Sequence, residues 1–196
     1  MNKKVRRLKN LILFQPNVLK KGMIVKMDIE EIKRNANNKE FMIKAVSEQG
    51  KYLEYASSEL KDDIDVVKTA LNQDGESLEF VSDNLKNNKE VVLLGIEKAP
   101  WTACYASEKL KADRDVIKSS VKTYGQTLYY ASEDLRDDDE IVKLAVSNKG
   151  LIVKYASYRL RDNKEIGELA VKQNKEAYHF WSPRLKADED IKSLLN

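Results

Sequence analysis

The stretch DDEIVKLAVSNKGLIVKYASYRLRD, residues 138–162, decides the fold, because its pattern recurs along the chain every 25 residues. From Leu60 to Leu185 the period holds without an insertion or a deletion. Its most regular part reads YASSELKDD from Tyr55, FVSDNLKNN from Phe80, YASEKLKAD from Tyr105, YASEDLRDD from Tyr130, YASYRLRDN from Tyr155 and FWSPRLKAD from Phe180. Tandem copies at a short, fixed period predict a solenoid, in which each unit packs on its neighbours.

Each unit is predicted to begin with a helix, preceded by an Asp or Asn that caps it. These caps are Asn38, Asp63, Asn88, Asp113, Asp138, Asn163 and Asp188. An acid follows two places after each cap, where it favours the positive end of the helix dipole. The apolar positions fall at i, i+1, i+4 and i+5, as in Val66, Val67, Ala70 and Leu71. This spacing makes one stripe at helical period, so the stripe is predicted to face the core.

Glycine is predicted to end this helix in a left-handed conformation, which glycine adopts without strain. It recurs at Gly50, Gly75, Gly125 and Gly150. Pro100 and Lys175 replace it in two units, and Asn174 is a candidate left-handed residue beside Lys175. We therefore expect the two least regular junctions at Pro100 and Lys175.

A second, shorter helix is predicted in each unit, from the spacing i, i+3 and i+7 of residues such as Leu53, Ala56 and Leu60. A serine, Ser57 in this copy, lies inside the segment in all six units. Its hydroxyl can cap a new turn and leave a short, tight piece, which can be 3₁₀. The predicted fold is all-α: an α-solenoid of six 25-residue two-helix repeats, each an α-helix plus a short α or 3₁₀ helix.

The predicted organisation is a basic N-terminal cap or arm over residues 1–37 and a helical repeat domain over residues 38–196. We number the repeats 1 to 6 over 38–62, 63–87, 88–112, 113–137, 138–162 and 163–187, with a partial repeat over 188–196.

The columns of the repeat resemble a known family. An Asp/Asn cap, two β-branched residues, Ala-Val, Gly and then Leu-x-Tyr-Ala-Ser-x-x-Leu-Lys are similar to the helical repeat called domain of unknown function 4116, over about residues 38–196. The resemblance implies an all-helical repeat whose biochemical role is not established. A looser, architectural likeness is to the leucine-rich repeat variant, which alternates an α-helix with a 3₁₀ turn. Trp181 and Pro183 depart from the pattern, and Trp181, in a column of small residues, is predicted to fill space at the C-terminal end.

Composition agrees with a soluble, helix-rich chain: of 196 residues 42% are apolar and 34% charged, with seven Gly and three Pro. The single Cys104 cannot form an intrachain disulfide, which favours a reducing compartment. The apolar run from Leu11 to Phe14 is too short for a secretory signal. No stretch approaches the roughly 20 apolar residues of a membrane span. We expect a cytoplasmic location, in the producing cell or in a host cell.

The N-terminal segment is strongly basic. Through Lys26 it carries eight basic and no acidic residues, whereas the remainder has 27 basic and 32 acidic residues, a net charge of −5. Its first basic residues, which we call the basic arm, are Lys3, Lys4, Arg6, Arg7 and Lys9. One interpretation is a helix or small hairpin that covers the open apolar face of repeat 1. The others are contact with nucleic acid or an acidic membrane surface, and simple disorder. Asp28 is predicted to cap a bridging helix through Arg34.

Residues for catalysis or metal binding are scarce. His179 is the only imidazole and Cys104 the only thiol, and they belong to different repeats. A structural zinc site needs four Cys or His ligands. The sequence has no Gly-rich phosphate loop, and carboxylate pairs such as Asp62 and Asp63 fall at helix starts, which explains them. We predict no enzymatic activity, no cofactor and no metal.

A basic column follows the repeat leucine, at Lys61, Lys86, Lys111, Arg136, Arg161 and Lys186. Stacked repeats would place these cations in one line, along which a phosphate backbone or an acidic protein could lie. A structural interpretation competes, because a cation at the C-terminal end of each short helix is favoured by the helix dipole.

Two columns, three residues apart, vary freely between the copies, and this spacing places them on one helix face. The first column is Lys51, Glu76, Trp101, Gln126, Leu151 and Glu176, and the second is Glu54, Glu79, Cys104, Tyr129, Lys154 and His179. We predict that this helix face binds the partner, because it carries aromatic and apolar side chains of the kind that anchor interfaces. Its candidate residues, with neighbours, are Trp101, Tyr124, Gln126, Tyr129, Leu151, Lys154, Tyr158 and His179. Ordinary packing between repeats is the alternative.

The sequence therefore favours a non-enzymatic helical-repeat protein that binds a macromolecule, most simply a protein or protein complex, as an adaptor or as an inhibitor by occlusion. The alternative is a nucleic-acid-binding protein that uses the basic arm and the basic column. The sequence does not identify the partner.

Overall fold

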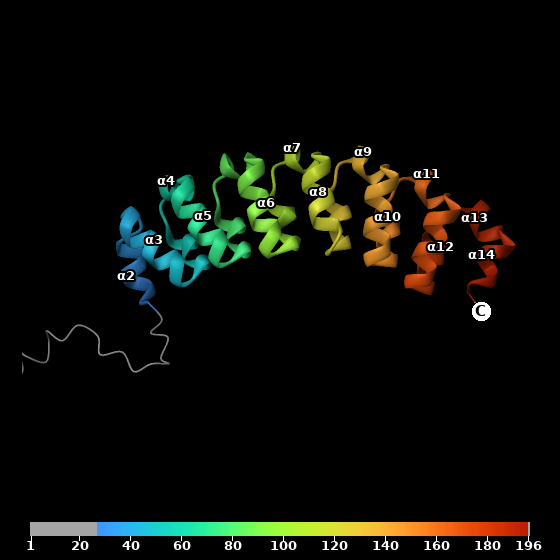
Figure 1. Cartoon of the computed structure of the whole chain (residues 1–196), viewed down its shortest axis with the longest axis horizontal. Helices are drawn as coiled ribbons and strands as arrows, with labels where there is room; N and C mark the ends of the chain where they lie inside the picture. Colours follow the sequence, from blue (N-terminus) through green and yellow to red (C-terminus); the bar gives the residue numbers. More distant parts are fainter. Residues whose placement is uncertain (1–26, 196) are drawn as a thin grey trace, which may run out of the picture.

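The computed structural model describes residues 27–195, which form a gently curved row of stacked helices without a strand (Figure 1). The predicted all-α solenoid is confirmed. The basic arm, Lys3, Lys4, Arg6, Arg7 and Lys9, lies outside the described residues. None of the helices within 27–195 has the length and hydrophobicity needed to cross a bilayer.

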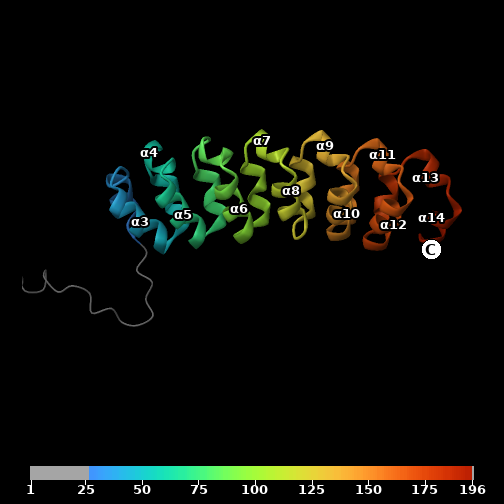
Figure 2. The ribbon, with the colours of Figure 1, turned by 45° about the horizontal axis from the view of Figure 1, so that its top comes forward.

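Each unit contains three helical pieces. The long helices are α3 (Lys39–Glu48), α5 (Ile64–Gln73), α6 (Lys89–Lys98), α8 (Arg114–Val121), α10 (Asp139–Asn148) and α12 (Lys164–Gln173), and the last unit has only α14 (Glu189–Ser193). The 3₁₀ helices that follow are η1 (Gly50–Tyr55), η2 (Gly75–Phe80), η4 (Pro100–Tyr105), η5 (Gly125–Tyr130), η6 (Gly150–Tyr155) and η7 (Lys175–Phe180). The short helices are α4 (Ser58–Lys61), η3 (Leu85–Asn87), α7 (Glu108–Lys111), α9 (Glu133–Arg136), α11 (Tyr158–Arg161) and α13 (Pro183–Ala187). These short helices lie along the outer edge of the arc, as the two views show (Figures 1 and 2).

The predicted caps are confirmed at every long helix. The carboxylate of Asp63, for example, accepts hydrogen bonds from the backbone N–H groups of Asp65 and Val66 at 3.0 and 3.2 Å. The same bond type is made by the six other cap residues. Asp28 likewise caps α2 (Ile29–Arg34), the bridging helix predicted before repeat 1.

The second half of each unit differs in detail from the single short helix that was predicted. Serine separates two pieces, because its hydroxyl accepts from a backbone N–H three residues on and so starts a new helix. The 3₁₀ piece lies before this serine, and the piece after it is α-helical except at η3. Serine also joins the repeats: the N–H of Ser107, for instance, donates to the carbonyl of Lys86 in the preceding repeat at 3.0 Å.

The prediction of left-handed glycines was wrong. None of the repeat glycines has a positive φ angle. Most long helices end in an extended residue such as Gln49, with φ −148° and ψ 109°, whereas α8 ends at Lys122 in a helical conformation. Asn174 is extended too and caps η7. Glycine is needed instead because the backbones of neighbouring repeats approach each other closely. A Cβ on Gly50 would lie 2.5 Å from the carbonyl oxygen of Ala70 in the next repeat.

Pro100 does mark an irregular junction. Gly50 donates its N–H to the side-chain amide of Gln73, but Pro100 has no N–H to donate. There the hydroxyl of Ser120 donates to the carbonyl of Pro100 at 2.7 Å, and α8 has eight residues where the other long helices have ten. At Lys175 the junction is regular, contrary to the prediction: η7 has six residues and is capped by Asn174, as η2 is capped by Asp74.

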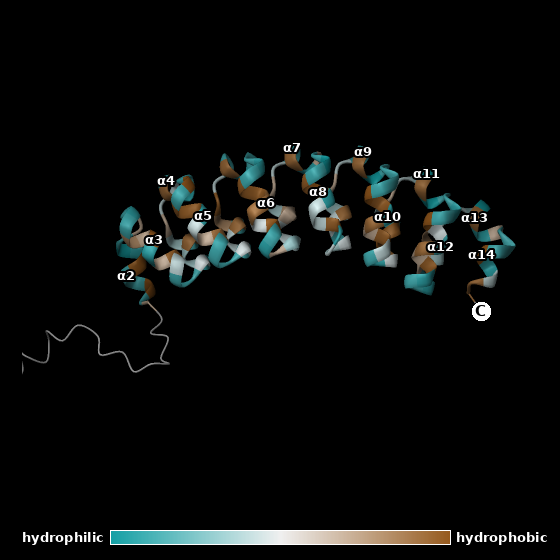
Figure 3. Cartoon of the chain, in the orientation of Figure 1, coloured by the Kyte–Doolittle hydropathy of each residue, from teal (hydrophilic) through white to brown (hydrophobic). Residues whose placement is uncertain are grey.

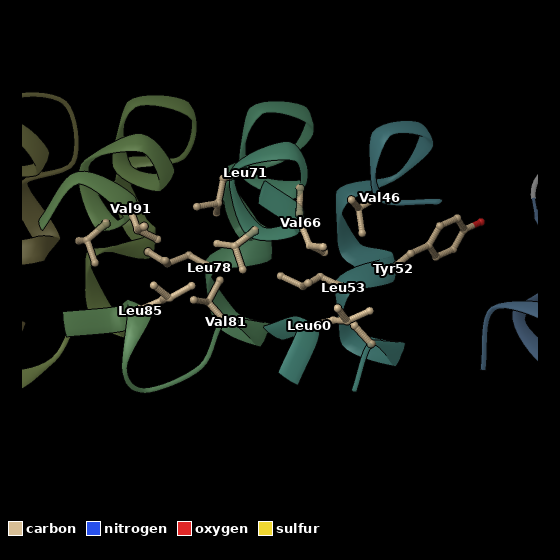
Figure 4. Close-up of a cluster of buried hydrophobic side chains, with 14 of the residues drawn as sticks. Val46, Tyr52, Leu53, Leu60, Val66, Leu71, Leu78, Val81, Leu85 and Val91 are labelled. Atoms are coloured by element: carbon tan, nitrogen blue, oxygen red, sulfur yellow. The ribbon is translucent and has the colours of Figure 1, made fainter. Parts of the chain in front are cut away.

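The core lies between the long helices and the 3₁₀ helices and extends to buried leucines of the short helices, such as Leu60 and Leu110. Figure 3 shows hydrophobic segments in the short helices at the outer edge as well as in the long helices. Val66 and Leu71 of α5 are fully buried and lie beside Leu53 and Leu78 of the 3₁₀ layer (Figure 4). Trp181 is only 4% exposed and packs against Gly167, so the prediction that it fills space is confirmed.

Candidate functional site

Exposed aromatic side chains concentrate on repeats 3 to 5. Among residues 27–195 the exposed large hydrophobic side chains are Ile64, Trp101, Tyr129, Tyr130 and Tyr158. Ile64 belongs to a long helix, whereas the others belong to 3₁₀ helices or to the short helix α11. Tyr129 is 54% exposed and Trp101 is 43% exposed, so about half of each of these residues contacts solvent.

A groove of about 400 Å³ lies between η5 and η6. We call it the aromatic groove; it is lined by Tyr124, Gln126, Tyr129, Tyr130, Lys149, Leu151, Ile152, Lys154 and Tyr155. Five of the residues selected from sequence meet here, namely Tyr124, Gln126, Tyr129, Leu151 and Lys154. Trp101 lies at its side, with its ring centroid 6.3 Å from that of Tyr124 in an edge arrangement.

The local geometry of the 3₁₀ helix explains this convergence. A 3₁₀ helix has three residues per turn, so side chains three apart stand directly above one another. Gln126 and Tyr129 are such a pair in η5, and Leu151 and Lys154 are the equivalent pair in η6. The two freely varying columns therefore form one continuous face across neighbouring repeats.

The rings around the groove hold one another in place. The ring of Tyr129 lies 4.9 Å from that of Tyr130 and 4.8 Å from that of Tyr155, in tilted or edge arrangements. The ammonium of Lys154 lies 4.8 Å from the centroid of Tyr155, a favourable cation–π distance. These contacts fix the aromatic side chains before any partner arrives.

A second groove, of about 290 Å³, adjoins the first. We call it the arginine groove; it is lined by Glu133, Arg136, Tyr155, Ala156, Ser157, Tyr158 and Arg161. Tyr155 lines both grooves, and Tyr158, 65% exposed, stands in the second. The structure thus brings part of the basic column next to the aromatic face, although the sequence presented them as separate features.

The rest of the basic column is not a free stripe. Its residues are half-buried, and several of its side chains already bind other groups of the protein. Lys86 and Lys186 donate to the carbonyls of Glu79 and His179 at 2.8 Å, and Lys111 lies 2.8 Å from Glu108. Lys61 is half-buried at the end of α4.

Other candidates from the sequence lie apart from both grooves. His179 is exposed on η7 and packs edge-on against Tyr178 at 6.0 Å. Cys104 lies three repeats away on η4, so the only imidazole and the only thiol do not meet. Burial raises the pKa of the Cys104 thiol, which disfavours the reactive thiolate. Within the described range of 27–195, no three His, Cys, Asp or Glu side chains are grouped to hold a metal ion.

Sequence reasoning missed four residues of the aromatic groove. Tyr130 and Tyr155 belong to the constant Tyr/Phe column, which looked like core because it does not vary. The polar hydroxyl of tyrosine was the available signal, since it favours a position with one apolar and one wet side. Ile152 is buried beneath the groove, and Lys149 precedes the glycine of repeat 5.

The repeat unit matches the model of one protein family in five overlapping places. The family is described as domain of unknown function (DUF4116), and the matches cover residues 38–86, 67–111, 88–136, 113–161 and 138–186. Neither a curated protein nor a solved structure matches the chain.

Proposed function

This chain belongs to the DUF4116 family, and we propose that it is a non-enzymatic protein that binds a protein partner through the aromatic groove and the adjoining Trp101. It would act as an adaptor, or as an inhibitor that covers a surface of a larger complex. The observation that carries this proposal is the set of exposed, mutually fixed rings on repeats 3 to 5, with Tyr129 at its centre.

Exposed aromatic side chains in a groove are the usual anchors of protein interfaces. Their rings lose little conformational freedom on binding when neighbours already hold them, which leaves more of the contact energy for affinity. Trp101 extends the surface from repeats 4 and 5 to repeat 3, and repeats stack about 8 to 10 Å apart. A surface that continues over three repeats suits a protein segment.

Charge on the same face supports a protein rather than a nucleic acid. Repeats 1 and 2 place Glu54, Glu76 and Glu79 in the two variable columns. Glu76 is paired with Lys51, and the other two carboxylates would repel a phosphate backbone laid along the face. The lysines of the basic column add little compensation, because Lys86, Lys111 and Lys186 are bound to groups of the protein itself. We also propose a cytoplasmic location, in the producing cell or a host cell, on the ground of the single Cys104.

The test compares immobilised wild-type protein with a Tyr129→Ala/Leu151→Ala variant in capture from a lysate of the source cell, with and without nuclease. We expect a protein captured by the wild type, resistant to nuclease, and lost with the variant. Ile64→Ala is the matched control, since Ile64 is an exposed apolar residue on a long helix, away from the groove. Capture that nuclease abolishes, or that the double variant retains, would contradict the proposal.

A further inference from the structure

We propose that Arg136 and Arg161 form an anion subsite that receives an Asp or Glu side chain of the protein partner. This inference rests on the proposed function and specifies the chemistry of the segment that binds. The two arginines end the short helices α9 and α11 of neighbouring repeats, and both line the arginine groove.

Within residues 27–195, the Nε–H groups of these two arginines lack the acceptors that Arg159 and Arg184 have. The Nε–H of Arg136 and that of Arg161 are buried without a hydrogen-bond acceptor in the part of the chain that the structure describes. By contrast, Arg159 donates to Asp137 at 3.0 Å and Arg184 donates to Asp162 at 2.9 Å. Buried polar groups are normally satisfied, so these two guanidinium groups are short of acceptors among the described residues. Because the Nε atoms themselves are closed to solvent, a carboxylate from outside would bind the terminal N–H groups of the same forks.

The side chains are nevertheless held in place. The Cζ of Arg161 lies 5.9 Å from the ring centroid of Tyr158, and the side chain of Arg136 is 32% exposed. Within the basic column, arginine occurs only at these two positions, while the other four are lysine. Arginine offers a planar fork of donors that matches a carboxylate, which lysine does not.

The net charge of the groove favours a carboxylate over a phosphate. Glu133, at the rim, is 95% exposed and 3.9 Å from Arg136, so the two arginines together exceed the local acids by one charge. Asp137 and Asp162, which follow the arginines in sequence, are already paired with Arg159 and Arg184 and so do not neutralise the groove. One carboxylate balances this charge, whereas a phosphate dianion would exceed it and be repelled by Glu133.

The arginine groove adjoins the aromatic groove, so the partner needs an acidic side chain close to an apolar one along its chain. Tyr155 separates the two grooves and lines both, so a segment that crosses it contacts each in turn. An apolar or aromatic side chain would lie beside Tyr129 and Leu151, and the acidic side chain would reach Arg136 and Arg161. We therefore infer an extended acidic–apolar segment as the recognised element.

The experiment selects binders from a phage library of random peptides against the full chain, then measures their affinity as synthetic peptides. We expect selected peptides to share an Asp or Glu at a fixed spacing from an aromatic or aliphatic residue. The Arg136→Gln/Arg161→Gln variant is expected to weaken their binding about tenfold or more. Arg136→Lys/Arg161→Lys should recover only part of the affinity, because the charge returns without the fork.

Lys61→Gln is the control, a cation of the same column in repeat 1. Circular dichroism of each variant checks that the fold is kept. Peptides that depend on Tyr129 and Leu151 but not on the arginines would overturn this inference and leave the proposed function standing. Tighter binding of a phosphoserine peptide than of its Asp counterpart would also overturn it. A selection that yields no peptide dependent on either groove would contradict both proposals.

Discussion

At the scale of single residues, the repeat glycines set how closely the units stack. Gly50 begins η1 and faces the carbonyl oxygen of Ala70, which belongs to the next long helix. Real Cβ atoms do not approach an oxygen as closely as 2.5 Å, so any side chain there would push the repeats apart. The glycine column is therefore fixed by contact between neighbours and not by its own φ angle.

Gly50→Ala is expected to destabilise the protein by about 1 to 3 kcal/mol, because the added methyl group meets backbone that cannot rotate away. Chemical denaturation followed by circular dichroism measures this change. Gly95→Ala is the control: its Cβ would meet the flexible end of Leu78 at 3.0 Å, and alanine favours the helix interior. Equal losses for the two variants would contradict the proposed role of Gly50.

At the scale of elements, ion pairs join the N-terminal ends of the long helices. Lys39 at the start of α3 lies 2.8 Å from Asp63 and 2.7 Å from Asp65 at the start of α5. Lys89 and Lys164 make the same pairs with the caps of α8 and α14. The cap carboxylate thus serves two elements at once, since it also accepts from its own helix.

The bond from Lys39, and the N–H groups of its own helix, hold the pKa of Asp63 below its usual range. Because the pKa of Asp63 is lower in the folded protein, its carboxylate stabilises the fold fully above the ordinary aspartate pKa of about 3.9. This stabilisation of the fold is lost as the pH falls through the lowered pKa of Asp63. Asp63→Asn keeps the capping acceptor but loses the charge.

We expect the wild type to have a higher free energy of unfolding than Asp63→Asn at neutral pH. This difference should disappear in acid below the lowered pKa of Asp63. Urea denaturation of both proteins over a pH series measures it. A difference that stays constant down to the lowest pH would show that the carboxylate charge contributes nothing.

At the scale of the whole molecule, the buried side chains fall into two packing clusters that meet at α8. One cluster of buried side chains runs from Ile32 to Val116, and a second runs from Ile117 to Ile191, so they divide within α8. This division adjoins the irregular junction at Pro100 and Ser120. In repeat proteins each unit contacts only its neighbours, so we expect a destabilised cluster to open before the other one does.

Ile166→Ala, in the second cluster, is expected to speed hydrogen exchange in repeats 5 and 6 much more than in repeats 1 and 2. Val92→Ala, in the first cluster, should give the reverse pattern. Hydrogen exchange with mass spectrometry resolves the two halves. If both variants accelerated exchange equally along the whole chain, the solenoid would open as one unit and the division would have no energetic meaning.

Much of the candidate site could be found from sequence because variation between copies exposes positions that the core does not need. Gln126, Tyr129, Leu151 and Lys154 were selected in that way, and the structure brings them to one groove. His179 was selected by the same rule and lies elsewhere. Variation identifies surface, but it does not tell which parts of the surface are hollow.

Residue types alone were enough to predict the all-α repeat, the caps such as Asp63 and the buried stripe such as Val66, because each depends on one helix turn or on a fixed period. The stacked repeats were needed to show that Gly50 serves close packing, and that Arg136 and Arg161 lie beside the aromatic groove. These features depend on how residues of successive repeats meet in space. The distance and burial between such neighbours follow from the stacking of whole units, which no single repeat encodes.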